Sequence, residues 1–401
     1  MDSIILTRKQ EEGLKIALER YKNKEPYTCI AGYAGTGKST LVSHIIAALG
    51  IDRHEVCYVA YTGKAAQVLR DKGNPGAKTA HRLLYKHIPK GDGTFIKQII
   101  RPLFPRYKII VVDEVSMLPM SMWTLLLSHN IYILALGDPG QLPPIATDDS
   151  NDVLQHPHIF LDEVLRQAQD SSIIRLSMDI RNLKPLKLQK DSEVQVVSKK
   201  EYLEHPGMIK WADQIICAKN ATRTMINHKY REDLMNQYEH SVPIIGDKVI
   251  CLRNIWNSPN MFGDCMVNGL IGKITDIEVK YNNPYIKPAI IGDFLPEGYE
   301  DMTEVPQSLL TFDNLLFDPK IFATGEKTMA TKQDYRRIPQ KFRPYEFDYA
   351  YAITCHKAQG SEYGKVLIFE EYMKGDNKES HARWLYTAVT RAKDKLIIVK
   401  A

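Results

Sequence analysis

Residues 31–40, AGYAGTGKST, restrict the fold of this chain more than any other stretch. A glycine, four residues and then Gly-Lys-Ser lie between a short apolar run at 26–31 and a stretch with apolar residues at helical spacing at 39–49. A strand, a glycine-rich loop and a helix in this order favour a phosphate-binding loop, because backbone N–H groups and a helix N-terminus then face an anion. The alternative, a glycine turn without a ligand, does not account for this spacing in this context.

The loop predicts a bound nucleotide, ATP, together with Mg²⁺. A lysine at this position contacts the β- and γ-phosphates, and the hydroxyl that follows it ligates Mg²⁺, so Lys38 and Ser39 take these roles. The residues of the loop expected to bind the nucleotide are Gly32, Gly35, Thr36, Gly37, Lys38, Ser39 and Thr40.

Further strand-like runs indicate that the loop belongs to a parallel α/β sheet. Residues 56–60 precede a helix-like stretch, and residues 107–117 and 130–144 each contain a continuous apolar run that ends in polar residues. Ligands of open α/β sheets bind at the carboxyl ends of the strands. We therefore expect Asp113 to hold Mg²⁺, Glu114 to orient or deprotonate an attacking water, and Gln141 to lie near the γ-phosphate.

Composition sets limits on class and compartment. The chain has 401 residues, which favours two or more domains, and its formal net charge is only +5, so nucleic-acid binding would depend on a local groove. The six cysteines lack metal-ligand spacing, which predicts reduced core thiols without zinc or disulfides. No apolar segment reaches 18 residues, which predicts no membrane span and a cytoplasmic protein, in the host cytoplasm if phage-encoded.

The order of motifs along nearly the whole chain resembles superfamily 1 helicases, particularly the RecD/Dda-like 5′-to-3′ branch called superfamily 1B. The stretches GYAGTGKST, VVDEVSM and GDPGQLPP are similar to its motifs I, II and III, and ITCHKAQGSEY and YTAVTRAK to its motifs V and VI. In size and layout the chain is closest to the compact Dda-type phage helicases. The resemblance implies that Gln10 and Gly360 contact the nucleotide and that Arg166 and Arg391 are arginine fingers, although either arginine alone would be an ordinary surface residue.

The resemblance also implies two RecA-like domains with ATP between them, which move along single-stranded DNA and unwind duplex DNA. The first would comprise residues 1–81 and 106–155, and the second 156–245 and 345–401, with a β-rich, barrel-like insertion at 246–344. The implied strand contacts are Thr62, Lys64, Thr79, His81, Thr354 and His356. Alternatives that stay open are a translocase without strong unwinding, an RNA helicase and, least favoured, a phosphate-loop kinase.

An Asp92-Gly93 step between two strand-like runs predicts an inserted hairpin at 82–105. A motor that pulls one strand needs a rigid element for the duplex to strike, and Phe95 beside the turn, or Tyr85 or His87 on the opposite limb, would offer a stacking surface to a base. The competing interpretation is an ordinary surface hairpin whose side chains pack on its own domain. We expect the protein to act as a monomer on single-stranded DNA and duplex junctions, with a single-strand-binding protein and replication or recombination proteins as candidate partners.

Overall fold

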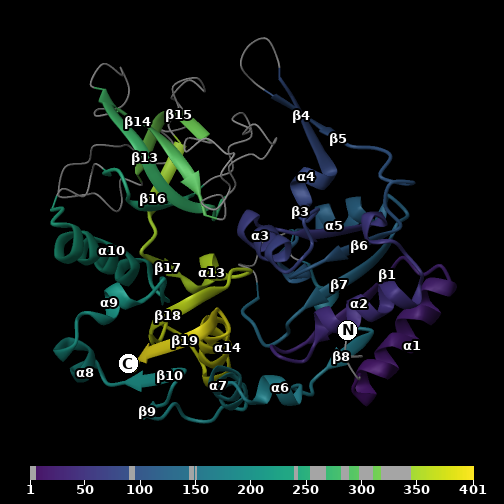
Figure 1. The fold of residues 1–401 in the computed structure, drawn as a ribbon, viewed down its shortest axis with the longest axis horizontal. Coiled ribbons are helices and arrows are strands. Elements are labelled where there is room, and N and C mark those ends of the chain that lie inside the picture. Colours follow the sequence, from purple (N-terminus) through teal and green to yellow (C-terminus); the bar gives the residue numbers. More distant parts are fainter. Residues whose placement is uncertain are drawn as a thin grey trace.

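Two β-sheets, a β-barrel and a β-hairpin form the framework of the chain in the computed structural model (Figure 1). The first sheet lies on the right of the view in purple and blue, the second at the lower left in teal and yellow, and the barrel above the second in green. The structure describes residues 6–89, 95–143, 149, 151–238, 243–252, 268–280, 289–297, 310–317 and 345–401.

The first sheet has six parallel strands in the order β3-β2-β6-β7-β1-β8. Their bounds are β1 (Tyr27–Gly32), β2 (Val56–Ala60), β3 (Lys78–Thr79), β6 (Ile109–Val112), β7 (Tyr132–Gly137) and β8 (Ile159–Leu161). Strands β6 and β7 are buried throughout, which explains their continuous apolar runs. The division into domains stays a prediction, but β8 pairs with β1 and extends the first sheet past the expected boundary at residue 155.

Helices connect these strands, and the phosphate loop joins β1 to α2. The helices are α1 (Arg8–Lys22), α2 (Lys38–Ala48), α3 (Gly63–Asp71), α4 (Ala80–Leu84) and α5 (Met120–Leu127), with 3-10 turns η1 (Arg53–Glu55), η2 (Val115–Met117) and η3 (Val153–Gln155). Leu41, Val42 and Ile45 on α2 are buried, because the apolar face of this helix packs on the sheet.

The expected hairpin is present as β4 (Tyr85–Pro89) and β5 (Phe95–Ile99), which pair antiparallel from Tyr85 with Ile99 to Pro89 with Phe95. It projects from the first half of the molecule (Figure 1). The Asp92-Gly93 turn and the side chain of Phe95 lie outside the described residues.

The second sheet follows the order β17-β11-β18-β19-β10-β9, and only β9 pairs antiparallel. Its strands are β9 (Gln189–Lys190), β10 (Val194–Val197), β11 (Gln214–Cys217), β17 (Ala352–Thr354), β18 (Tyr363–Phe369) and β19 (Ala392–Val399). The helices of this half are α6 (Arg166–Gln169), α7 (Ser172–Arg181), α8 (Lys199–Glu204), α9 (Met208–Trp211), α10 (Asn220–Met235), α13 (Cys355–Ala358) and α14 (Lys378–Val389). Within the described part of the chain, no helix has the length and apolar character needed to cross a membrane.

A closed five-stranded barrel is inserted between β11 and β17. Its strands are β12 (Lys248–Cys251), β13 (Ile271–Lys280), β14 (Ala289–Pro296), β15 (Leu310–Phe317) and β16 (Tyr345–Tyr349). All neighbours are antiparallel except β15 and β16, which close the barrel in parallel. The predicted fold class, two RecA-like parallel sheets with a hairpin and a barrel-like insertion, is confirmed.

Buried ion pairs join α10 to the base of the barrel. Arg231 and Asp247 are fully buried with Nη2 and Oδ2 3.2 Å apart, and the Tyr351 hydroxyl donates to Asp247 Oδ1 over 2.7 Å. Arg223 Nη2 lies 2.8 Å from Asp348 Oδ2. Breaking such a pair leaves an uncompensated buried charge, so these contacts fix the barrel on the second half.

Five of the six cysteines lie among the described residues, and all five are buried, as the core-thiol interpretation expects. Burial raises the pKa of Cys57 to about 11 and that of Cys29 to about 12. These thiols therefore stay protonated near neutral pH. Cys265 lies outside the described residues.

Candidate functional site

The phosphate loop turns between β1 and α2 on two glycines in the left-handed region. Gly35 has φ 76° and Gly37 has φ 77°. A Cβ on Gly37 would lie 2.4 Å from Gln10 Nε2, and a Cβ on Gly35 would lie 3.0 Å from Ala168 Cβ. The left-handed backbone therefore favours glycine at both positions, as the motif predicted, and neighbouring side chains lie close to both.

Gln10 supports this loop from α1. Its Nε2 donates to the Thr36 carbonyl over 3.2 Å, and its Oε1 accepts from the Thr7 backbone N–H over 3.0 Å in a capping box. The side chain is 1% exposed. The expected nucleotide-binding glutamine is thus next to the loop, where its amide group also holds the loop backbone.

Lys38 and the residues after it begin α2. The Lys38 ammonium donates to the carbonyls of Gly32 and Tyr33 over 2.7 and 3.1 Å, which keeps it folded over the loop. Ser39 is exposed and Thr40 half-buried in the first turn of the helix. The loop thus presents an ammonium and a hydroxyl on the side where the helix N-terminus carries partial positive charge.

Asp113 and Glu114 follow β6 at its carboxyl end. Glu114 has φ 50°, an uncommon conformation for a non-glycine residue, and its backbone N–H donates to Asp113 Oδ1 over 3.0 Å. Burial raises the pKa of both carboxyls, the Asp113 charge raises the pKa of Glu114 further, and Lys38 acts in the opposite direction on both. Two neighbouring acids of this kind favour a nearby cation or a shared proton.

The loop after β7 brings Gln141 to Glu114. Gln141 Nε2 donates to Glu114 Oε1 over 3.3 Å, and Asp138 Oδ1 accepts from the Gly140 N–H over 2.8 Å, which fixes the turn. The three polar residues expected at the strand ends, Asp113, Glu114 and Gln141, therefore lie together.

Helix α14 of the second half reaches across to these loops. The Tyr386 hydroxyl accepts from the Ala34 N–H in the phosphate loop over 2.9 Å and donates to Asp138 Oδ2 over 2.7 Å. Thr387 Oγ1 accepts from the Leu142 N–H over 2.7 Å. Sequence reasoning missed Tyr386, although it belongs to the YTAVTRAK stretch, because a tyrosine in an amphipathic helix is typical of a core position.

Arg391 follows α14 and is 4% exposed. Its Nε donates to the Thr387 carbonyl over 3.0 Å and its Nη1 to the Ser361 carbonyl over 3.2 Å. Its charge lowers the pKa of Glu114, so the two lie within electrostatic range across the boundary between the sheets. Arg166 begins α6, and its side chain lies outside the described residues.

A third arginine, Arg181, lies at the phosphate loop, and the sequence did not single it out. The Arg181 guanidinium at the end of α7 stacks over the Tyr33 ring at 3.6 Å, and the Phe160 ring meets Tyr33 edge-on at 5.4 Å. Gly360, expected at the nucleotide, has φ 72°, and a Cβ there would lie 2.9 Å from Ala65 Cβ on α3. Gly360 therefore packs against α3, the helix at which contacts to the DNA strand are expected.

Two of the expected nucleic-acid contacts act as helix caps. Thr62 Oγ1 accepts from the Ala65 N–H and Thr79 Oγ1 from the Arg82 N–H, each over 3.2 Å, so they position α3 and α4. Thr354 precedes α13 in the second half.

His81 lies in a row of rings. Its ring centroid is 5.8 Å from that of Tyr61 and 6.1 Å from that of Tyr85, which leads toward the hairpin. Burial lowers the pKa of His356, which is therefore neutral near pH 7. Lys64 makes an ion pair with Glu297 of the barrel.

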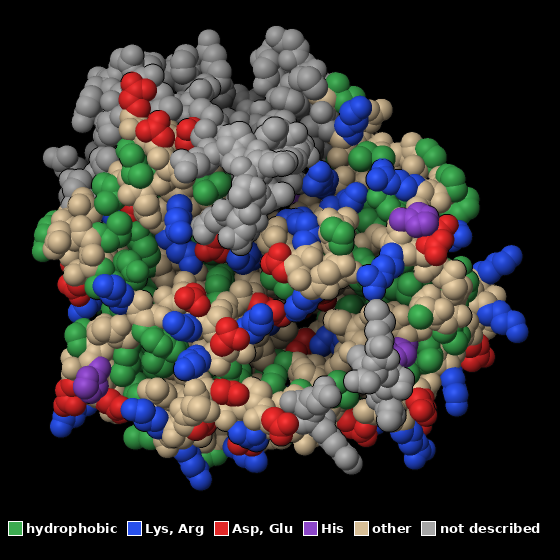
Figure 2. Space-filling view, viewed as in Figure 1, with side chains coloured by type: hydrophobic (Ala, Val, Ile, Leu, Met, Phe, Trp, Pro, Cys, Tyr) green, Lys and Arg blue, Asp and Glu red, His purple; other side chains and the backbone are tan. Residues whose placement is uncertain are grey.

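The space-filling view shows how these parts meet (Figure 2). Lysine and arginine side chains gather on this face between the barrel and the first half, and the face is hollowed near its middle. A modest net charge of +5 is thus compatible with a locally basic surface.

Known families match both halves of the chain. The model described as an AAA domain matches residues 6–201, and the model described as a UvrD-like helicase C-terminal domain matches residues 349–399. A phosphate loop on one RecA-like sheet, joined by hydrogen bonds to a helix on a second RecA-like sheet, defines a class of P-loop proteins with two such sheets.

Characterised relatives narrow this class. The ATP-dependent RecD2 DNA helicase of Deinococcus radiodurans is 27% identical over 91% of this chain and 46% of its own length. The ATP-dependent DNA helicase dda of Enterobacteria phage T4 is 28% identical over 44% of this chain and 43% of its own length. The chain thus spans less than half the length of these two relatives. These similarities support the resemblance of the chain to the superfamily 1B helicases, the RecD/Dda-like group, that its motifs indicate.

A solved structure shares the fold. A Pif1 helicase chain, from a study of DNA unwinding at forked double-stranded DNA by two coordinating Pif1 helicases, has a TM-score of 0.51 with 17% identity. The similarity covers 98% of this chain and 92% of that chain. At this level of identity the match concerns the fold alone.

Proposed function

We propose that this chain is an ATP-dependent DNA helicase that moves 5′ to 3′ along single-stranded DNA and unwinds duplex DNA. One observation carries the proposal: the Tyr386 hydroxyl bonds both the phosphate loop and Asp138 from the opposite half of the molecule. A nucleotide in the loop would therefore act on the contact between two sheets, which is the arrangement that a two-state motor requires.

ATP fits the phosphate loop through its backbone N–H groups and Lys38. The carboxylate of Asp113 and the hydroxyl of Ser39 are oxygen donors of the kind that Mg²⁺ takes, and the neighbouring acids, with pKa values raised by burial, would be stabilised by a cation. Bound there, Mg²⁺ would neutralise charge on the phosphate oxygens.

Glu114 is the proposed general base. A carboxyl whose pKa is raised by burial and by Asp113 accepts a proton from water more readily than an ordinary glutamate. The amide of Gln141 holds the Glu114 carboxylate in place. Arg391 and Arg166 would stabilise charge on the transferring phosphoryl group from the second half, and Arg391 would need to exchange its backbone partners for the phosphate.

Closure on ATP and opening after hydrolysis would move the two halves along one DNA strand. Hydroxyl, imidazole and ammonium groups on α3, α4 and α13 suit backbone phosphates and sugars without reading sequence. The projecting hairpin would meet the duplex, and the exposed Ile88 and Ile99 side chains give it apolar surface. The names of the relatives, RecD2 and dda DNA helicases, agree with this proposal.

The test is ATP hydrolysis with and without single-stranded DNA, followed by unwinding of duplexes with a 5′ or a 3′ tail. We expect stimulation by DNA and unwinding of the 5′-tailed substrate. Turnover indifferent to nucleic acid would favour a kinase, stimulation without strand separation would favour a translocase, and a requirement for RNA would favour an RNA helicase. Gel filtration with light scattering tests the monomer expected from the layout.

A further inference from the structure

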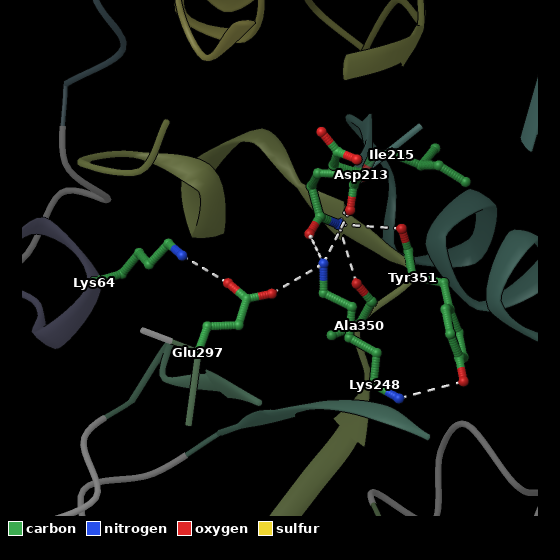
Figure 3. A network of polar contacts seen from close by, with 8 residues as sticks. Lys64, Asp213, Ile215, Lys248, Glu297, Ala350 and Tyr351 are labelled. Atoms are coloured by element: carbon green, nitrogen blue, oxygen red, sulfur yellow. Dashed lines mark hydrogen bonds and ion pairs between the residues drawn. The ribbon is translucent and has the colours of Figure 1, made fainter. Parts of the chain in front are cut away.

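A carboxylate of the barrel lies between two lysines from different parts of the fold (Figure 3). Glu297 directly follows β14, Lys64 belongs to α3 of the first half, and Lys248 begins β12. Lys64 Nζ is 2.7 Å from Glu297 Oε2, and Lys248 Nζ is 3.2 Å from Oε1. Each carboxylate oxygen thus has its own ammonium group.

This arrangement is held by further contacts. The Glu297 backbone N–H donates to the Ile271 carbonyl over 2.9 Å, which ties it to β13. Lys248 Nζ also donates to Gln214 Oε1 over 3.0 Å, on the second sheet. The Tyr363 ring lies 5.7 Å from Lys64 Nζ and 5.8 Å from Lys248 Nζ, within the range of a cation–π interaction. The lysines are therefore positioned as an anion site.

The three charged side chains are only 15 to 20% exposed, so solvent screens them less than an ordinary surface pair. Burial alone would raise the pKa of Glu297, but Lys248 and Lys64 lower it to about 2. The cluster therefore contains two positive charges and one negative charge near neutral pH. A phosphodiester group carries one negative charge and two free oxygens, so it could replace the carboxylate charge for charge.

We propose that Lys64 and Lys248 form a subsite for a backbone phosphate of single-stranded DNA, and that Glu297 occupies this subsite until the strand displaces it. The inference rests on the proposed function and adds Lys248, on the barrel, to the strand-binding surface. Because Lys64 lies on the first half, its ion pair with Glu297 connects that half to the barrel. Binding of a DNA strand would replace this ion pair by a connection through the bound phosphate.

The bridge between Lys72 and Glu362 also crosses between the halves, but it differs from this cluster. Its side chains are 51% and 40% exposed, and it joins one ammonium group to one carboxylate, without a second lysine. An exposed pair of this kind contributes little to the free energy of folding, typically less than about 1 kcal/mol. Replacing the Glu297 carboxylate by a DNA phosphate in the partly buried cluster is therefore expected to change the affinity for DNA.

The test is Glu297→Gln, measured by fluorescence anisotropy with a labelled single-stranded oligothymidylate. Removing the competing carboxylate should tighten binding about five- to tenfold at low salt. The local charge rises by one, so the slope of log affinity against log salt should steepen by about 0.7. In a Lys64→Gln/Lys248→Gln background, Glu297→Gln should have no effect, because the subsite is gone.

The matched control is Glu12→Gln, which removes the same charge from an exposed pair with Arg8 on α1 and should bind like the wild type. Affinity of Glu297→Gln within twofold of the wild type, or an equal gain in the double-lysine background, would overturn the proposal. If Glu297→Gln melts below the assay temperature, Glu297→Asp replaces it. That side chain is too short to reach both lysines, so tighter binding supports the proposal and unchanged binding overturns it.

The same series separates this inference from the proposed function. Wild-type protein that neither binds single-stranded DNA nor shows DNA-stimulated ATP turnover would overturn both. Wild-type protein that does both, with Glu297→Gln unchanged, would overturn the phosphate subsite alone.

Discussion

Replacing Tyr386 by phenylalanine tests how the two halves are coupled. The change removes one hydroxyl and leaves the ring, which is 1% exposed, in place. Burial, and secondly the Asp138 charge, raise the pKa of Tyr386, so the hydroxyl is protonated and can donate at any pH used in an assay. The variant loses the bonds to Ala34 and Asp138 together.

The magnitude follows from the two partners. A hydrogen bond between neutral groups contributes about 1 kcal/mol and one to a charged group about 1.5–3 kcal/mol. The contact between the phosphate loop, Asp138 and α14 should therefore weaken by about 3 kcal/mol, which corresponds to about 100-fold in an equilibrium or rate ratio. Because the proposed catalytic arrangement requires this contact, the loss should appear in kcat/KM for ATP.

The assay is steady-state ATP hydrolysis at saturating single-stranded DNA. Tyr372→Phe is the matched control, since it removes a hydroxyl from an exposed tyrosine of the same half. Circular dichroism melting verifies that both variants fold. If Tyr386→Phe keeps kcat/KM within threefold of the control, the hydroxyl does not couple the halves and the reasoning is refuted.

Further predictions concern the catalytic residues and the hairpin. Glu114→Gln should abolish turnover but still bind a fluorescent ATP analogue, whereas Lys38→Ala should lose both; substantial hydrolysis by Glu114→Gln would exclude it as the base. Arg391→Ala should lower DNA-stimulated hydrolysis by about 10³-fold without weakening DNA binding, and near-normal turnover would contradict the two-domain motor. Deleting residues 90–94 should preserve DNA-stimulated hydrolysis but lower the unwinding rate per ATP on a 5′-tailed duplex, and an unchanged ratio would assign the wedge elsewhere.

The sequence predicted those features that depend on local patterns. The apolar runs at β1, β2, β6 and β7 end in glycine or polar residues, and the strands of the first sheet end at nearly the same places. The left-handed conformations of Gly35 and Gly37 follow from the motif itself. An Asp-Gly step between short apolar runs was enough to predict the β4–β5 hairpin.

Contacts between distant segments were beyond such reasoning. Tyr386 and Ala34 are 352 positions apart in the sequence, and Lys64 and Glu297 are 233 positions apart. The local spacing of apolar and polar residues does not indicate that either pair is in contact. That Gln10 contacts the nucleotide stays a prediction, but the sequence did not indicate that its amide also bonds the loop backbone, because this bond depends on how the first turn of α1 packs on that loop. The parallel closure of the barrel by β15 and β16 likewise depends on tertiary packing that alternation alone does not specify.

The strand order of the second sheet has a consequence for how the protein is made on the ribosome. Both neighbours of β11, namely β17 and β18, come after the barrel in the chain, and Cys217 and Ile353 are 136 positions apart. At about 5–20 residues per second, translation leaves β11 without its neighbours for roughly 7 to 27 s. The first sheet has all its strands once Leu161 has emerged, so nascent chains should carry a complete first sheet beside an incomplete second sheet whose apolar strand surface is exposed to aggregation.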